Sequence, residues 1–290
     1  MPLVFAAIAP HGFPLIPDLA EDAGGARQTR AAMLELQRRA AAAGVEAVVL
    51  AGPHGVRVNG AVALADTGRA AGSLAWEGRT VELNVPVDGA LTDAIAGAAR
   101  ERGVPIALVG YGGSRRAQSV LPLDWGLLTP LWFLGHDHTM PGQGHVLADP
   151  PAEDTGPPAV LVTPSRSVPR PQLVQFGEAV AAVAAASPRR IAFVASCDWG
   201  HRHDESGPYG YHPASAEVDA DIVAAVAAND LLSLRDFPDA RAEAAAIDGL
   251  WQLLMLAGAL TGTNWPSDVI SYEAPTYYGM LVATWGEPRA

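Results

Sequence analysis

Two histidines stand in the same short motif, each at the end of an apolar run. Residues 2–9 lead into Pro10-His11-Gly12, and residues 45–52 lead into Pro53-His54-Gly55. A neutral imidazole is a common metal ligand, so two of them delivered at strand ends would begin a metal site. A carboxylate to accompany them is offered by Glu273, which ends a third strand-like stretch.

Two histidines and one carboxylate make the ligand set of a facial triad. Such a triad occupies one face of an octahedral ion and leaves three positions open, as in non-haem Fe(II) oxygenases. The open positions allow a substrate and dioxygen to bind one metal together. We therefore predict that His11, His54 and Glu273 converge on one metal ion. The competing interpretation is that both histidines are loop residues bonded to backbone carbonyls.

Alternating strand and helix patterns would position these side chains. Strands are expected at 2–9, 45–51, 57–65, 73–85, 104–110, 159–163, 190–196, 268–273 and 278–285, and helices at 25–43, 88–102, 169–187, 213–228 and 240–260. This alternation favours an α/β fold, with a central mostly parallel or mixed sheet flanked by helices in a single domain over 1–290. Ligands of such sheets bind beyond the carboxyl ends of the strands, where both histidines are expected.

Charge and composition limit the classes of molecule that this chain is expected to bind. The chain has 290 residues with a formal net charge of -12 and no Lys/Arg cluster, which argues against nucleic acid and anionic membranes. The single cysteine, Cys197, excludes an internal disulfide and is expected in the core. Because the first residues lack a signal-peptide pattern and no apolar stretch is long enough to span a membrane, we expect a soluble cytoplasmic protein.

Four short motifs occur in order along nearly the whole chain. They are APHG at 9–12, GPHG at 52–55, SCDWGHR at 196–202 and SYEAPTYYG at 271–279. In these motifs the chain resembles the class III extradiol ring-cleaving dioxygenases, in the catalytic-subunit superfamily that includes protocatechuate 4,5-dioxygenase. The resemblance implies an α/β sandwich in which Fe(II), bound by His11, His54 and Glu273, cleaves a catecholic or aminophenolic ring with O2. The expected partners are a small aromatic substrate and O2, with a homo-oligomer or a separate small subunit.

His201 is the expected acid/base residue. It follows the strand expected at 190–196, and the matching histidine of the family acts near the metal as an acid/base group. An imidazole titrates in the range that this role needs. The alternative is a histidine that only pairs with Asp198 or Asp204. We assign Asp198 and Tyr277, which lie in the same motifs as the ligands and His201, to the substrate pocket.

Trp125 departs from the family pattern. Many members carry a second active-site histidine in an Asp-His-Gly segment, where this chain has Asp124-Trp125-Gly126. An indole cannot shuttle a proton, but it stacks on aromatic rings and donates one hydrogen bond. Trp125 is therefore expected either to line the substrate pocket or to belong to the core.

The remaining histidines are expected to serve other purposes. The Gly- and Pro-rich segment 135–158 contains His136, His138 and His145. We interpret these three as surface or substrate-lid residues rather than as a zinc site. His203 is interpreted as a surface residue and His212 as a helix-entry residue.

Two alternative functions share the same fold. A Memo-like protein of this superfamily would bind metal or take part in signalling without oxygenating a ring, and the tryptophan at position 125 favours it. A relative of the plant-type DOPA dioxygenases would use Zn(II) in place of Fe(II).

Overall fold

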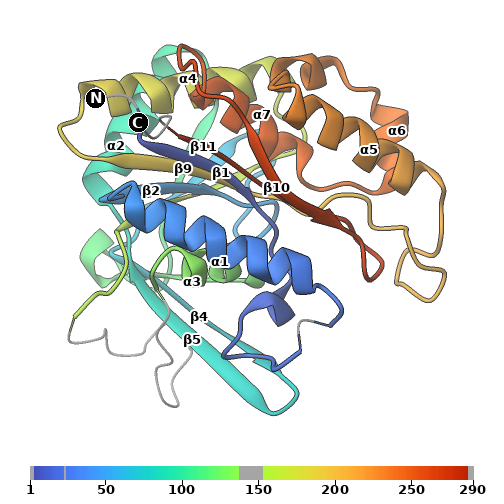
Figure 1. The fold of residues 1–290 in the computed structure, drawn as a ribbon. Helices are drawn as coiled ribbons and strands as arrows, with labels where there is room; N and C mark the ends of the chain where they lie inside the picture. The colour runs from blue at the N-terminus through green and yellow to red at the C-terminus, as the bar shows by residue number, and fades with distance from the viewer. Residues whose placement is uncertain (1–2, 23, 137–152, 287–290) are drawn as a thin grey trace.

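The computed structural model describes residues 3–22, 24–136 and 153–286, which are built around one large mixed sheet (Figure 1). Its strands are β1 (Phe5–Ala9), β2 (Ala47–Ala51), β3 (Val62–Ala65), β6 (Ile106–Val109), β8 (Ala159–Pro164), β9 (Ile191–Ser196), β10 (Asp268–Glu273) and β11 (Met280–Gly286). They follow the order β10-β11-β1-β9-β2-β8-β3-β6. β1, β9, β2 and β8 run parallel to one another, so their carboxyl ends meet at one edge of the sheet.

Helices cover both faces of this sheet. They are α1 (Arg27–Ala42), α2 (Gly89–Glu101), α3 (Trp125–Phe133), α4 (Arg170–Ala186), α5 (Ala214–Ala227), α6 (Asp239–Ala245) and α7 (Leu250–Ala259), with short 3-10 helices η1 (Phe13–Leu15), η2 (Arg116–Gln118) and η3 (Leu231–Asp236). In Figure 1, α2, α4 and α7 lie on one face, and α1 and α3 lie on the other. The mostly parallel sheet between helices confirms the α/β fold expected from the sequence.

Residue alternation along the central strands divides the core into two layers. On β2, Val49 faces the layer of α4 and α7, while Val48 and Leu50 face the layer of α1 and α3. Burial on both faces explains why these strands read as continuous apolar runs in the sequence. The core therefore fixes the register of each strand, and with it the position of the residue that follows the strand.

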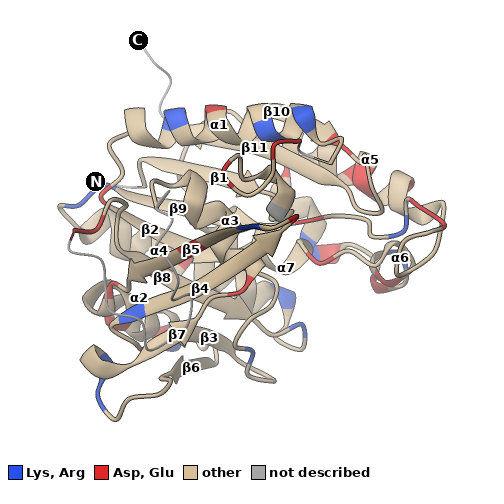
Figure 2. Cartoon of the chain, turned by 90° about the horizontal axis from the view of Figure 1, so that it is seen from below, with Lys and Arg blue, Asp and Glu red and all other residues tan. Residues whose placement is uncertain are grey.

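A second sheet covers the side of the molecule below α3. It contains β4 (Arg69–Trp76), β5 (Arg79–Pro86) and β7 (Val120–Pro122), in the order β5-β4-β7. Figure 2 shows this sheet from below, crossing in front of the main sheet, with acidic and basic residues interspersed over the elements. Within the described part of the chain, no helix is both long enough and apolar enough to cross a membrane.

The helix expected over 240–260 is wrong in one respect, because the chain forms two helices there. α6 ends at Ala245, and the C-cap residue Ala246 takes a left-handed backbone conformation with φ of 54°. α7 begins only after Gly249. The apolar periodicity continues through the break, since Ile247 and Leu250 are both buried. The apolar periodicity therefore did not reveal the turn between α6 and α7.

Candidate metal centre

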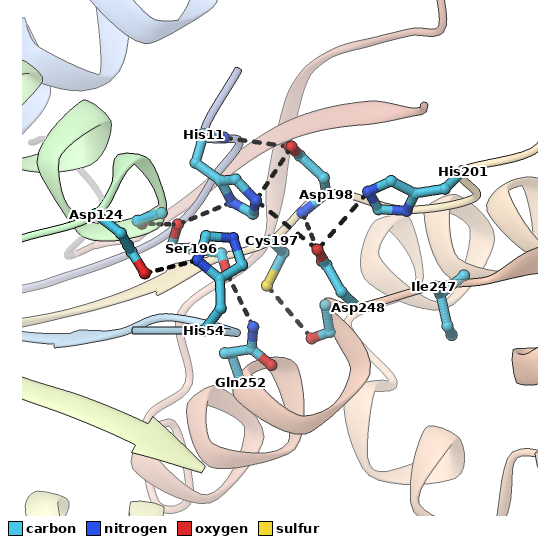
Figure 3. Close-up of polar contacts among 12 residues, drawn as sticks. His11, His54, Asp124, Ser196, Cys197, Asp198, His201, Ile247, Asp248 and Gln252 are labelled. Atoms are coloured by element: carbon cyan, nitrogen blue, oxygen red, sulfur yellow. Dashed lines mark hydrogen bonds and ion pairs between the residues drawn. The ribbon is translucent and has the colours of Figure 1, made fainter. Parts of the chain in front are cut away.

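Three parallel strand ends bring the site together. β9 lies between β1 and β2 and pairs with both. His11 follows β1, His54 follows β2 and Asp198 follows β9, so these side chains gather at the carboxyl edge of the sheet (Figure 3). The rings of His11 and His54 lie edge to face with their centroids 5.2 Å apart. This is the place where open α/β sheets bind ligands.

The carboxylate that joins the two histidines is Asp248. One ligand atom from each of His11, His54 and Asp248 lies within 4.8 Å of the others. Among the residues that the structure describes, no second group of histidines, cysteines and acids meets this condition. The three residues could therefore hold a metal ion, and their side-chain types are those of a facial triad.

Hydrogen bonds orient both imidazoles. The Ser196 hydroxyl donates to the Gly126 carbonyl at 2.5 Å, so it accepts from His11 Nδ1 at 3.1 Å. His54 Nδ1 lies 2.7 Å from Asp124 Oδ2, and an ionised carboxylate only accepts. With the proton on each Nδ1, each Nε2 presents its lone pair. Outer-shell bonds of this kind fix the tautomer and orientation of metal-binding histidines.

The break between α6 and α7 positions Asp248. Gly249 packs so closely that a Cβ on it would come within 2.6 Å of Cys197 Cβ, which lies beyond the end of β9. The Asp198 backbone N–H donates to Asp248 Oδ1 at 3.2 Å. A continuous helix could not present the side chain in this way, because the turn brings the backbone against the loop after β9. Asp248 is thereby held opposite the two histidines.

Burial determines the protonation of the cluster. It raises the pKa of Asp198 well above its usual range, and the neighbouring Asp248 raises it further. Burial also raises the pKa of Asp248, although His201 and His54 oppose that shift. The pKa of His11 is lowered well below its usual value, first by burial and then by His54 and His201. At neutral pH His11 is therefore uncharged, as a metal ligand must be.

This donor set fits a divalent cation. Both imidazoles are oriented, and two acids crowd the same space, the buried Asp198 and the half-buried Asp248, with His11 Nε2 3.2 Å from Asp198 Oδ2 and 3.8 Å from Asp248 Oδ2. A divalent ion would relieve the repulsion between these carboxylates. Fe(II) accepts this set of ligands with open positions, and Zn(II) accepts the same ligand types.

The expectation that Glu273 is the third ligand is corrected by the structure. The side chain lies at the end of β10, where Glu273 Oε1 accepts bonds from the Thr29 backbone N–H and hydroxyl, each 2.7 Å long. Thr29 belongs to the first turn of α1, whose N–H groups have no partner within the helix. A carboxylate there also complements the helix dipole. Glu273 therefore caps a helix rather than joining His11 and His54.

Glu273→Ala is expected to destabilise the fold without removing the metal. The buried Thr29 would lose its acceptor, which costs about 1–3 kcal/mol of unfolding free energy. Chemical denaturation should report this loss, while the metal content after loading stays at the wild-type level. Full stability combined with loss of metal would contradict the assignment of Glu273 as a cap.

His201 lies beside the three ligands and outside their group. Its Nε2 is 3.7 Å from Asp248 Oδ2. Its Nδ1 is buried and has no hydrogen-bond partner in the described part of the chain. Three tyrosine rings pack against the imidazole at centroid distances of 5.7 to 6.0 Å; they belong to Tyr209, Tyr277 and Tyr278. The ring is thus held in place by packing, which leaves its nitrogens available for proton transfer.

The residues expected to bind substrate surround the same space. Trp125 is 46% exposed and its ring lies 4.4 Å from that of His54, so it belongs to the rim of the site and not to the core. Tyr277 is half-buried next to His201. Asp198 is buried and accepts the His11 backbone N–H at 3.1 Å. One oxygen of Asp198 is thus already used in a hydrogen bond to the chain segment that carries His11.

Other histidines take structural roles. His136 is buried and donates from Nε2 to the Pro157 carbonyl at 2.9 Å, so the expectation of a surface or lid residue is wrong for it. His203 is not a surface residue either, because its Nε2 lies 2.9 Å from the buried Asp219. His212 accepts the Ala214 N–H at the start of α5, as expected of a helix-entry residue. His138 and His145 lie outside the described residues.

Sequence reasoning missed Asp248 and Asp124, although each carries a local signal. Asp248 precedes Gly249, and an Asp-Gly pair inside a helical pattern is a turn signal. Asp124 is the N-cap of α3 and accepts the Leu127 N–H, while its other oxygen orients His54. An Asp before an apolar run is a typical helix start.

Comparison with known proteins decides the family. Residues 6–283 match the model of the catalytic LigB subunit of aromatic ring-opening dioxygenase. The chain belongs to this LigB family. Family membership agrees with the resemblance seen in the four sequence motifs, and the match includes His11, His54, His201 and Asp248.

Two further proteins are similar to this chain. Protein CA_C1420 of Clostridium acetobutylicum is 22% identical over 227 residues, which are 78% of this chain. This chain spans only 45% of the length of that relative. The crystal structure of the uncharacterized protein JW3007 from Escherichia coli K12 superposes with a TM-score of 0.61 at 16% identity, over 97% of this chain and 99% of that one. The latter likeness supports the fold alone.

Proposed function

We propose that this LigB-family chain is an extradiol dioxygenase that opens a catecholic or aminophenolic ring with O2 and uses Fe(II). The observation that carries the proposal is the convergence of His11, His54 and Asp248 next to His201. Two imidazoles and one carboxylate leave positions open on an octahedral ion, which is what a ring substrate and dioxygen need in order to bind the same metal. Family membership supports the same reaction class.

Each group has a distinct task in this proposal. His11, His54 and Asp248 would hold the metal, and a ferrous ion there supplies chelation of two adjacent ring heteroatoms together with a position for dioxygen. Trp125 presents an aromatic face at the rim, on which the ring of the substrate would stack. His201 would accept a proton from the ring hydroxyl and return it later in the reaction.

The proposal is tested with protein loaded anaerobically with either Fe(II) or Zn(II). A panel of catechols and 2-aminophenols is added with O2, and oxygen uptake is followed together with the absorbance of the ring-opened product. We expect turnover with Fe(II), with one O2 consumed per ring opened. Turnover by the Zn(II)-loaded protein and not by the Fe(II)-loaded protein would identify zinc as the catalytic metal. Metal binding without turnover of any compound would contradict the proposal and favour a Memo-like, non-oxygenase role.

Trp125→Ala is expected to raise KM for ring substrates by about 3- to 10-fold, because the stacked face is lost. Trp125→Phe keeps an aromatic face and should restore most of the affinity. Steady-state kinetics measure both variants, and metal analysis verifies that His54, which packs on Trp125, still binds its ion. An unchanged KM in Trp125→Ala would remove the tryptophan from the substrate site.

A further inference from the structure

Tyr278 lies in the wall of the metal centre on the side of His201. It belongs to the turn between β10 and β11, and its ring stacks on that of His201 at 5.7 Å with an interplanar angle of 21°. The ring of the neighbouring Tyr277 also packs against that of Tyr278, with the two ring centroids 4.9 Å apart. The tyrosine ring is therefore fixed from two sides.

The hydroxyl of Tyr278 reaches the strand end that carries a metal ligand. A Cβ on Gly12 would come within 2.5 Å of this oxygen, and Gly12 directly follows His11. The absence of a side chain at position 12 thus makes room for the phenol beside the ligand. The hydroxyl therefore lies next to the chain segment that carries His11.

No described residue forms a hydrogen bond with this hydroxyl. The contrast is Tyr272 on the neighbouring strand, whose hydroxyl donates to the buried Asp219 at 2.7 Å. Tyr278 is half-buried, and its hydroxyl is not among the fully buried polar atoms without a partner, so the oxygen is accessible from outside the protein. The pKa of Tyr278 is raised, first by burial and then by Asp198, so the phenol keeps its proton and remains a donor at neutral pH. A donor without a protein acceptor is suited to an acceptor on a bound ligand.

We propose that the Tyr278 hydroxyl donates a hydrogen bond to an oxygen of the ring substrate bound at the His11–His54–Asp248 centre. This inference rests on the proposed function, since it needs a ligand with an anionic oxygen in that place. Tyr278 would then be a substrate-binding residue that favours the deprotonated ring oxygen. It gives the site a hydroxyl donor besides the imidazole of His201.

The test uses 4-nitrocatechol, whose colour reports its ionisation, with anaerobic iron-loaded protein. Tyr278→Phe should bind this probe about 10- to 100-fold more weakly than the wild type, the loss expected for one hydrogen bond to a charged acceptor. The pH at which the bound probe loses its second proton should rise, because the donor that favours the anion is gone. The melting temperature of the metal-free variant should not fall, because the hydroxyl bonds to no described residue.

Three further variants separate the outcomes. Gly12→Ala keeps the phenol but displaces it, so it should reproduce the weaker binding while retaining iron. Tyr111→Phe removes an exposed phenol beyond β6, at the far edge of the sheet, and should bind like the wild type. Tyr272→Phe should lower the melting temperature, since it breaks a bond to Asp219.

The possible results distinguish this inference from the proposed function. Equal affinity and equal probe ionisation in Tyr278→Phe and the wild type would overturn the role of Tyr278 alone. Failure of the iron-loaded wild type to bind 4-nitrocatechol would contradict the proposed function and this inference together. A lower melting temperature with unchanged binding would make Tyr278 a packing residue.

Discussion

Asp248→Asn is expected to lower the affinity for Fe(II) by at least about 100-fold, whereas Glu273→Gln should leave it unchanged. Asp248 supplies the anionic ligand opposite His11 and His54, and even outer-shell changes cost a metal site 10- to 100-fold. Glu273 contacts Thr29 instead, so its charge does not reach the ion. Iron per chain after anaerobic loading and dialysis, determined by mass spectrometry, measures both variants.

Although Asp248→Asn should weaken iron binding, it is not expected to destabilise the metal-free protein. Burial disfavours the charged forms of both Asp198 and Asp248, and the charge of Asp248 raises the pKa of Asp198 further. Replacing one carboxylate by a neutral amide relieves this repulsion, so the melting temperature of metal-free Asp248→Asn should not fall. Loss of iron therefore cannot be ascribed to unfolding. Iron retained by Asp248→Asn and lost by Glu273→Gln would reverse the assignment of the ligand.

His201→Ala is expected to slow ring opening by about 100- to 10,000-fold, the usual contribution of a positioned acid/base group. Iron content and 4-nitrocatechol binding should remain, because His201 stands outside the ligand group. His201→Phe retains the stacking with Tyr278 but cannot carry a proton, and its turnover should be equally low. Agreement between the two variants would show that proton transfer is lost, not packing.

The matched control for this experiment is His203→Gln. His203 lies two residues along the same loop and pairs with the buried Asp219, away from the ligand group. We expect a lower melting temperature in this variant and turnover within a few-fold of the wild type. If His201→Ala turned over at the wild-type rate, His201 would have no part in the reaction.

The fold and the two histidines were predictable for a shared reason. Apolar runs such as that of β2 are buried on both faces, which makes them visible in the sequence and fixes their register. A residue that directly follows such a run can then be placed at the carboxyl edge of the sheet. The repeated Pro-His-Gly motif marked two of these ends, and the structure places His11 and His54 there.

The carboxylate was not predictable by the same reasoning. Asp248 comes from a turn between two helices, and apolar residues continue through that turn with helical spacing. Its approach to β9 depends on a tertiary contact between Gly249 and Cys197, which no local pattern encodes. Glu273 stands at a strand end, but on β10 at the sheet edge, where its nearest partner is the first turn of α1. Glu273, the acid predicted from the sequence, is therefore separated from β1 by β11, whereas the turn before α7 brings Asp248 to the histidines.

The most direct test of the account is a crystal structure of the iron-loaded protein, with anomalous diffraction data collected on both sides of the iron absorption edge. One anomalous peak is expected among the side chains of His11, His54 and Asp248, with metal–ligand distances of about 2.0–2.2 Å. Glu273 is expected to stay on Thr29. A peak that includes Glu273, or iron bound at a place remote from His11 and His54, would contradict this account.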